Sequence, residues 1–410
     1  MLPATLFLAV CLYAAVQAIP LAIPGVASEF WVLAQQSGIE GIRPTISISP
    51  VATWTALMRL VTYGLVFWLV LQTCRSSRRT SQAVLIIGLS AAAYGQYGIL
   101  VNLAGSSSVL WFEKWAYGES LTGTFINKNS FATFLGLGLL CVVTHLTHRF
   151  LYTNREMIQD PLDGRLFSKG VPFDILAMVA AAMCVVAALL LTQSRAGILS
   201  SFFAVIIFLL GLAFRSRGTR KIGIATTGSI VLLFALFFYV SGEGLTHRLS
   251  RLIWTDADLM ARVEVYSSTL SAIGDHPLLG VGYGTFEDGF RVYRSEDTQA
   301  YFDKAHNTYL ELAMELGIPA ATALSLAIVV IAIFCLRGWK RRRRLFVYPW
   351  LSFCATMLVS LHALVDFSLQ IPAVAIQFSA ILAIGCAQSW SGQMDTAQFG
   401  RHSQVHSLRS

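Results

Sequence analysis

Apolar segments of about 20 residues recur along this chain, and they limit its fold more than any other feature. Each segment predicts one helix that crosses a membrane. The ten predicted spans are 4–24, 53–73, 83–103, 131–150, 173–192, 196–214, 222–240, 308–336, 345–366 and 371–390. Lipid offers the backbone no hydrogen-bond partners, and no segment alternates like a barrel strand. The sequence therefore predicts an all-α, polytopic transmembrane helical bundle.

The composition also indicates a membrane protein. Hydrophobic residues make up 55% of the chain and charged residues only 13%. A typical soluble domain carries about 25% charged residues. A disordered chain is excluded as well, because disorder requires low hydrophobicity and high charge. The formal net charge of +8 would suit nucleic acid, but in a membrane protein basic residues first indicate topology.

Basic residues cluster after every second predicted span. The clusters are Arg75, Arg78 and Arg79; Arg149, Arg155, Arg165 and Lys169; Arg215, Arg217, Arg220 and Lys221; and Arg337 with Lys340 to Arg344. Because basic loops stay in the cytoplasm, one orientation satisfies all four clusters, and it places both termini in the cytoplasm. We expect a transmembrane bundle over residues 1–390 and a cytoplasmic tail over 391–410.

The longest outer connection, residues 241–307, joins the seventh and eighth predicted spans and is predicted to form a helix-rich subdomain. Apolar residues at spacings of three and four predict a helix over 259–273, with Asp258 as its cap. The glycine cluster at 280–284 predicts a flexible turn. Its surroundings fit neither an ion filter nor a dinucleotide-binding loop.

Several polar residues lie at the predicted outer boundary of the bundle. The candidates are Lys128, Arg195, Arg262, His306 and Asp366, with Tyr266 and Asn307 close to them in sequence. Each also has a structural explanation: an arginine can extend to the interface, and a histidine or aspartate can form a local hydrogen bond. Together, however, two guanidinium groups suit a diphosphate, and an imidazole suits proton abstraction from a hydroxyl.

The sequence predicts a site without metal or cofactor. No His/Asp/Glu cluster with the spacing of metal ligands is recognised in it, so the arginines would stabilise the leaving group. Glu311 and Glu315, in the first turns of the eighth predicted span, are interpreted as charges that a helix N-terminus favours.

Six short motifs follow one another along the chain: Gly123–Ser130, Gln193–Gly197, Ala261–Tyr266, His276–Gly284, Ala305–Leu310 with Glu315–Ile318, and His362–Asp366. Each motif is weak alone, but their order and the predicted topology together are specific. Over about 120–385, the chain resembles the bacterial O-antigen ligase and O-antigen polymerase superfamily of polytopic membrane glycosyltransferases.

The resemblance implies a metal-independent GT-C-type transferase in the bacterial inner membrane, with residues 241–307 and the active face in the periplasm. The implied donor is a glycan on undecaprenyl diphosphate, and the acceptor is lipid A–core or another lipid-linked glycan. Arg195 and Arg262 would bind the diphosphate, and His306 would activate the acceptor hydroxyl. Lys128, Tyr266, Asn307 and Asp366 would support them.

The sequence leaves alternatives open. Ligase and polymerase use the same donor, so the sequence does not separate them. A polysaccharide or lipid transporter without covalent chemistry is a second class of function. Transporters tend to show internal repeats and charged spans near the midplane, and neither is found here apart from Arg59 within the second span. A non-catalytic membrane scaffold is a third class.

Overall fold

The computed structural model describes residues 1–21, 25–106, 108–118, 120–152, 172–215, 228, 256–294 and 302–390. In chain order its elements are α1 (Leu2–Ala18), α2 (Glu29–Gln36), α3 (Pro50–Thr73), α4 (Ser77–Leu103), β1 (Ser108–Val109), β2 (Phe112–Glu113), α5 (Lys128–Tyr152), α8 (Phe173–Leu191), α9 (Arg195–Arg215), α12 (Asp256–Asp275), α13 (Phe286–Tyr293), α14 (Thr308–Arg341), α15 (Val347–His362), a 3-10 turn (Ser368–Gln370) and α16 (Pro372–Ser389). The two short strands pair as an antiparallel hairpin.

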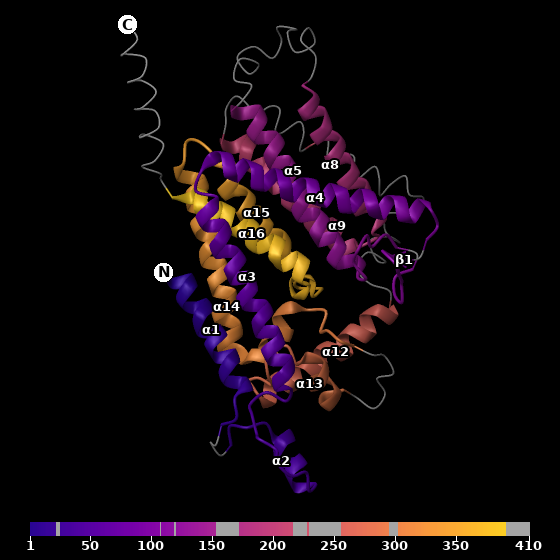
Figure 1. The fold of residues 1–410 in the computed structure, drawn as a ribbon, viewed down its shortest axis with the longest axis vertical. Coiled ribbons are helices and arrows are strands. Elements are labelled where there is room, and N and C mark those ends of the chain that lie inside the picture. Colours follow the sequence, from indigo (N-terminus) through magenta and orange to yellow (C-terminus); the bar gives the residue numbers. More distant parts are fainter. Residues whose placement is uncertain are drawn as a thin grey trace.

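The predicted all-α transmembrane bundle is confirmed (Figure 1). Seven of the described helices are long and apolar enough to cross a membrane: α3, α4, α5, α8, α9, α14 and α16. Two shorter apolar helices, α1 and α15, coincide with the first and ninth predicted spans. Each predicted span coincides with one of these helices except 222–240, which lies outside the described residues.

Some predicted boundaries differ from the structure. The first helix ends at Ala18 and not at 24, because Pro20 forces Ile19 into an extended conformation. The helix α15 ends at His362, so Asp366 lies beyond it, in the connection to α16. The helix α14 is longer than predicted and is kinked at Gly317.

The helix α5 is the most buried of the spans and forms the centre of the bundle, packed against α4, α8, α9 and α15. Small residues permit this packing. A Cβ atom on Gly138 would lie 2.0 Å from Cβ of Ala91 on α4, and one on Gly136 would lie 2.0 Å from Oγ of Ser201 on α9. Close backbone approach of this kind is a main source of helix association in lipid.

Basic residues meet at one end of the bundle. Arg215 donates hydrogen bonds to the carbonyl oxygens of Lys340 and Arg342, at 2.7 and 2.6 Å. The amide of Gln388 donates to the carbonyl oxygen of Cys74 at 2.8 Å. The ends of α3, α9, α14 and α16 therefore lie together, as the alternating basic clusters require.

The opposite end carries α12, α13 and the segment 276–284, which docks on the kink of α14 (Figure 1). Backbone hydrogen bonds join Ile318 to Pro277 and Val281 to Met314, at 2.8 and 2.9 Å. The glycine cluster is thus a closely packed connection and not the flexible turn predicted. The helix α12 begins at Asp256, so Asp258 lies inside the helix and not at its cap.

Replacing Gly317 with alanine is expected to destabilise the protein. Gly317 has φ 74° and ψ 159°, and a Cβ atom there would lie 2.3 Å from the carbonyl oxygen of Leu278. We expect the free energy of unfolding to fall by at least about 2 kcal/mol, measured as a lower midpoint of thermal unfolding in detergent. Gly274→Ala is the control, because its Cβ would meet nothing within 4 Å. Equal midpoints for the two variants would contradict the prediction.

Candidate active site

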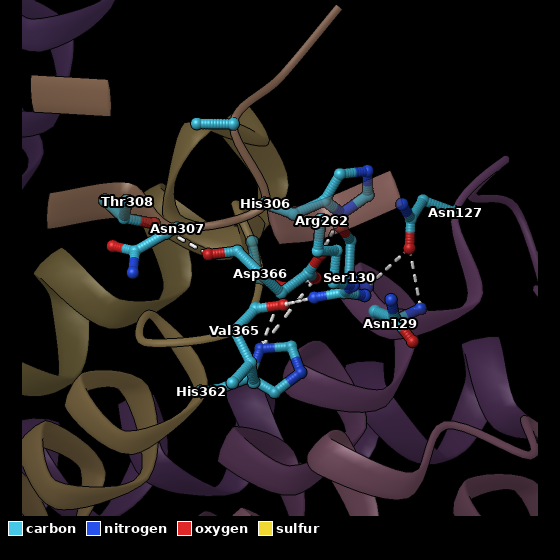
Figure 2. A network of polar contacts seen from close by, with 12 residues as sticks. Asn127, Asn129, Ser130, Arg262, His306, Asn307, Thr308, His362, Val365 and Asp366 are labelled. Atoms are coloured by element: carbon cyan, nitrogen blue, oxygen red, sulfur yellow. Dashed lines mark hydrogen bonds and ion pairs between the residues drawn. The ribbon is translucent and has the colours of Figure 1, made fainter. Parts of the chain in front are cut away.

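The side chains of His306 and Asp366 meet at the end of the bundle that carries α12 and α13 (Figure 2). Nδ1 of His306 lies 3.3 Å from Oδ1 of Asp366. The imidazole ring also packs edge-on against Phe302 and Phe367, with ring centroids 6.5 and 5.0 Å apart. An ionised carboxylate only accepts hydrogen bonds, so Nδ1 carries the proton and Nε2 is the basic nitrogen. This tautomer is the one that a general base requires.

Asp366 is buried and held by a polar network. Oγ of Ser368 donates to its Oδ2 at 2.9 Å and lies 3.1 Å from Nδ1 of His362. Oγ1 of Thr133 lies 2.9 Å from the same nitrogen. Burial opposes ionisation of Asp366, but the hydrogen bond from His306, the charges of both histidines and the bond from Ser368 hold its pKa below the usual value. The carboxylate is therefore ionised at neutral pH.

The backbone of His306 adopts a left-handed conformation, with φ 52°, which is uncommon for residues other than glycine. Two contacts hold it there. The hydroxyl of Tyr266 donates to the carbonyl oxygen of His306 at 3.1 Å. The carboxylate of Glu311 accepts from the N–H of Ala305 at 2.9 Å. Strained conformations persist where the surroundings determine them, and they gather at functional sites.

Asn307 begins α14 and joins it to the connection that carries Asp366. Its Oδ1 accepts from two backbone N–H groups in the first turn of α14, and its Nδ2 donates to the carbonyl oxygen of Leu364 at 3.1 Å. The hydroxyl of Thr308 donates to the carbonyl oxygen of Asp366 at 2.9 Å. Asn307 therefore positions the histidine and the aspartate relative to each other.

Glu311 and Glu315 do more than occupy a helix N-terminus. Both are buried; Glu311 lies 3.5 Å from Nζ of Lys304, and Glu315 accepts from the N–H of Phe286 at 3.0 Å. Burial opposes the charge of Lys304, but the carboxylates of Glu311, Glu315 and Asp303 raise its pKa above the usual value. The segment before His306 is thus anchored to α14 by an ion pair.

The two candidate arginines come from different helices. Nη1 of Arg262, on α12, donates to the carbonyl oxygen of Val365 in the connection between α15 and α16 (Figure 2). Arg195 is exposed at the first residue of α9. Its neighbour Ser194 donates from Oγ to Oδ1 of Asn129, in the first turn of α5, at 2.8 Å. In the view of Figure 2, the guanidinium of Arg262 lies between Val365 and Asn129.

A cavity of about 720 Å³ opens beside His306. Its walls come from α4, α5, α16, the connection before α5 and the segment 302–306. The aromatic ring of Tyr117 lines the cavity, and Nζ of Lys128 lies over this ring, 5.6 Å from its centroid. Arg195 and Arg262 are not among the residues that line the cavity.

The structure thus brings the predicted residues His306, Asn307, Asp366, Tyr266 and Arg262 into one connected group, with Lys128 and Arg195 at its edges. Sequence reasoning assigned no supporting role to Thr133, His362, Ser368 or Glu311. For Thr133 and His362 the available signal is a polar side chain inside an apolar span. Such a polar residue does not reveal its hydrogen-bond partner, because Thr133 and His362 lie more than 200 residues apart in the sequence.

Comparison with known families agrees with the motifs. Residues 180–325 match the model of a family described as O-antigen ligase. The matched segment contains Arg195, Arg262, Tyr266 and His306 and ends before Asp366. No curated protein matches the chain. Over residues 180–325, this multi-pass membrane protein is similar to the O-antigen ligase family, an enzyme family of the ligase and glycosyltransferase type.

Proposed function

We propose that this protein transfers a glycan from undecaprenyl diphosphate to an acceptor hydroxyl at the periplasmic face of the bacterial inner membrane. The observation that carries the proposal is the pair of partly buried His306 and buried Asp366 at one end of a membrane bundle, open to a cavity and connected to Arg262. The family match supports a glycosyltransferase. The donor and the acceptor are those that the resemblance implies, and the membrane face is inferred from the charge pattern.

In the proposed reaction, Nε2 of His306 takes the proton of the acceptor hydroxyl while the hydroxyl oxygen attacks the anomeric carbon of the donor sugar. The bond between that carbon and the diphosphate oxygen breaks, and undecaprenyl diphosphate leaves with the electron pair. The ionised Asp366 stabilises the imidazolium that forms. The configuration at the anomeric carbon is inverted.

Arg195 and Arg262 are proposed to stabilise the negative charge of the leaving diphosphate. Hydrogen bonds to charged groups contribute about 1.5–3 kcal/mol each. A guanidinium carries five N–H donors, so the bond from Arg262 to Val365 orients the group and is compatible with phosphate contacts. Tyr266, Asn307, Asp366 and Lys128 are proposed to position the histidine and the cavity wall.

The charge pattern supports the proposed orientation. The basic residues Arg75, Arg215 and Arg342 lie at the end of the bundle away from His306. The beginning of α1 and the end of α16 lie toward that end too (Figure 1). Basic residues favour the cytoplasmic side, so we propose cytoplasmic termini and a periplasmic active face.

A reconstituted assay tests the function and its independence of metal. Purified protein in liposomes, given an undecaprenyl-diphosphate-linked glycan and an acceptor, is expected to form a covalent product. Excess chelator is expected to leave the rate unchanged; the described residues hold no group of three or more His, Cys, Asp or Glu side chains arranged for a metal ion. Loss of activity that a divalent ion restores would contradict metal independence. Movement of the lipid-linked glycan across the bilayer without product would instead support a transporter.

The lipopolysaccharide of a deletion strain distinguishes the two forms of the proposed reaction. Loss of all attached chains would identify a ligase, which joins completed chains to lipid A–core. A single attached repeat would identify a polymerase, which lengthens the chain before it is joined.

A further inference from the structure

The proposed reaction assigns no ligand to the cavity beside His306, although its rim carries two large aromatic side chains. Trp115 is 78% exposed and Tyr117 is 37% exposed, and both lie in the connection between β2 and α5. Lys128 lies over the ring of Tyr117. Aromatic faces at the mouth of a cavity offer flat apolar surfaces to a ligand. The rim therefore suits a ligand with a flat, partly apolar face.

The same cavity contains polar groups placed for a ligand. Ser130 lines it and is fully buried, yet its Oγ makes no hydrogen bond within the described part of the chain. Asn127 accepts hydrogen bonds through Oδ1 from the backbone N–H groups of Asn129 and Ser130, at 2.7 and 3.2 Å. The amide –NH₂ group of Asn127 carries two N–H donors that can bond to a ligand. Burying a hydroxyl group without a hydrogen-bond partner costs free energy. This points to a ligand that supplies the missing hydrogen bond.

The charge of the cavity argues against the donor diphosphate as this ligand. Among the residues that line it, Asp303 carries a carboxylate, and no lysine or arginine is present. A diphosphate requires several cations in direct contact, and the nearby Lys128 and Lys304 are not among the lining residues. A sugar ring fits better: its C–H faces are apolar and stack on aromatic rings, while its hydroxyl groups bond to carboxylate, amide and hydroxyl partners.

We propose that this cavity binds the acceptor sugar, with the reacting hydroxyl directed at His306. The assignment rests on the proposed function. It follows from two placements: the proposed base lines the cavity, and a base must lie within hydrogen-bond reach of the proton it takes, whereas Arg195 and Arg262 lie outside the cavity lining. Trp115 and Tyr117 stack on the sugar, and Asn127, Ser130 and Asp303 bond to its hydroxyl groups.

Substitution of Trp115 tests the proposed stacking. Trp115→Ala is expected to raise the KM for the acceptor about tenfold, with the KM for the donor and the midpoint of thermal unfolding unchanged. Trp111→Ala is the matched control, because Trp111 is 79% exposed on the neighbouring hairpin and does not line the cavity. A raised donor KM with an unchanged acceptor KM would overturn the assignment and place the donor sugar in the cavity.

Substitution of Ser130 separates ligand binding from a structural role. Ser130→Ala removes a buried hydroxyl that has no partner in the described structure, so its midpoint of unfolding is expected to equal or exceed that of the wild type. The KM for the acceptor is expected to rise several-fold. A lower midpoint with an unchanged acceptor KM would show a structural role and overturn the proposal for Ser130.

Binding without turnover distinguishes failure of this inference from failure of the proposed function. The probes are core oligosaccharide released from lipopolysaccharide and the glycan repeat released from the lipid donor, titrated by calorimetry into His306→Ala protein. Binding of either probe that Trp115→Ala weakens and Trp111→Ala does not would support a sugar site even if no transfer were found. Absence of binding by both probes, in protein whose wild type transfers glycan, would overturn the cavity assignment alone.

Discussion

Replacing His306 with alanine is expected to reduce glycan transfer by a factor of about 10²–10⁴. The loss follows from the proposed chemistry: a hydroxyl is a weak nucleophile until a base takes its proton, and Asp366 holds the histidine in the tautomer that can do so. The reduction should appear in kcat under saturating donor and acceptor. Folding is checked by the midpoint of thermal unfolding, because alanine at position 306 must still adopt the left-handed backbone conformation, which a Cβ atom disfavours.

His276→Ala is the control for His306→Ala. His276 directly follows α12, at the same end of the bundle as His306, and is partly buried. It is expected to retain the wild-type rate. A well-folded His306→Ala protein with full activity would contradict the assignment of His306 as the base. Equal losses in the two variants would show that the assay reports folding and not proton transfer.

Replacing Arg262 with alanine is expected to lower kcat by about 10²–10³-fold, the usual effect of removing one donor that stabilises developing charge. The diphosphate gains charge as the sugar–oxygen bond breaks, so the loss should appear in the rate of a single turnover at saturating donor. Arg262→Lys is expected to recover only part of the rate, because an ammonium keeps the charge but lacks the planar, bidentate fork of a guanidinium.

Arg291→Ala is the control for Arg262→Ala. Arg291 lies on α13, at the same end of the bundle as Arg262, and forms an exposed ion pair with Glu287 at 2.5 Å. Exposed pairs of this kind contribute little to stability, so the rate should be unchanged. Full activity of a folded Arg262→Ala protein would show that the leaving diphosphate is stabilised by other groups. Full recovery by lysine would show that charge alone suffices.

Much of the fold follows from local sequence. Apolar length alone predicts the helices of the bundle, because a lipid-exposed backbone can satisfy its hydrogen bonds only within a helix or a closed barrel. The ends of helices are less certain, since they depend on single residues such as Pro20 and on the turn after His362. The β1–β2 hairpin and α2 were not predicted, because short elements in outer loops have no long periodic pattern.

The candidate site, like the fold, could be predicted only in part from the sequence. Its motifs indicated His306, Asp366 and the arginines because chemistry restricts residue type. Their arrangement stays hidden in the sequence: Thr133, His362 and Ser368 support Asp366 from three elements, and Glu311 holds the backbone before His306. A carboxylate four residues into a helix looks locally like a favourable end charge. Only packing shows that it is buried against Lys304.

The sequence by itself determined that this chain forms a bundle of membrane helices, which ends of those helices carry basic residues, and which family it resembles. These properties depend on hydrophobicity, charge and residue identity, each of which is read along the chain. The tertiary structure decided that His306 pairs with Asp366, that the arginines lie outside the cavity lining, and that Ser130 lines the cavity with a buried hydroxyl that makes no hydrogen bond within the described residues. These properties depend on distances between residues far apart in the chain, which only the packing of helices establishes.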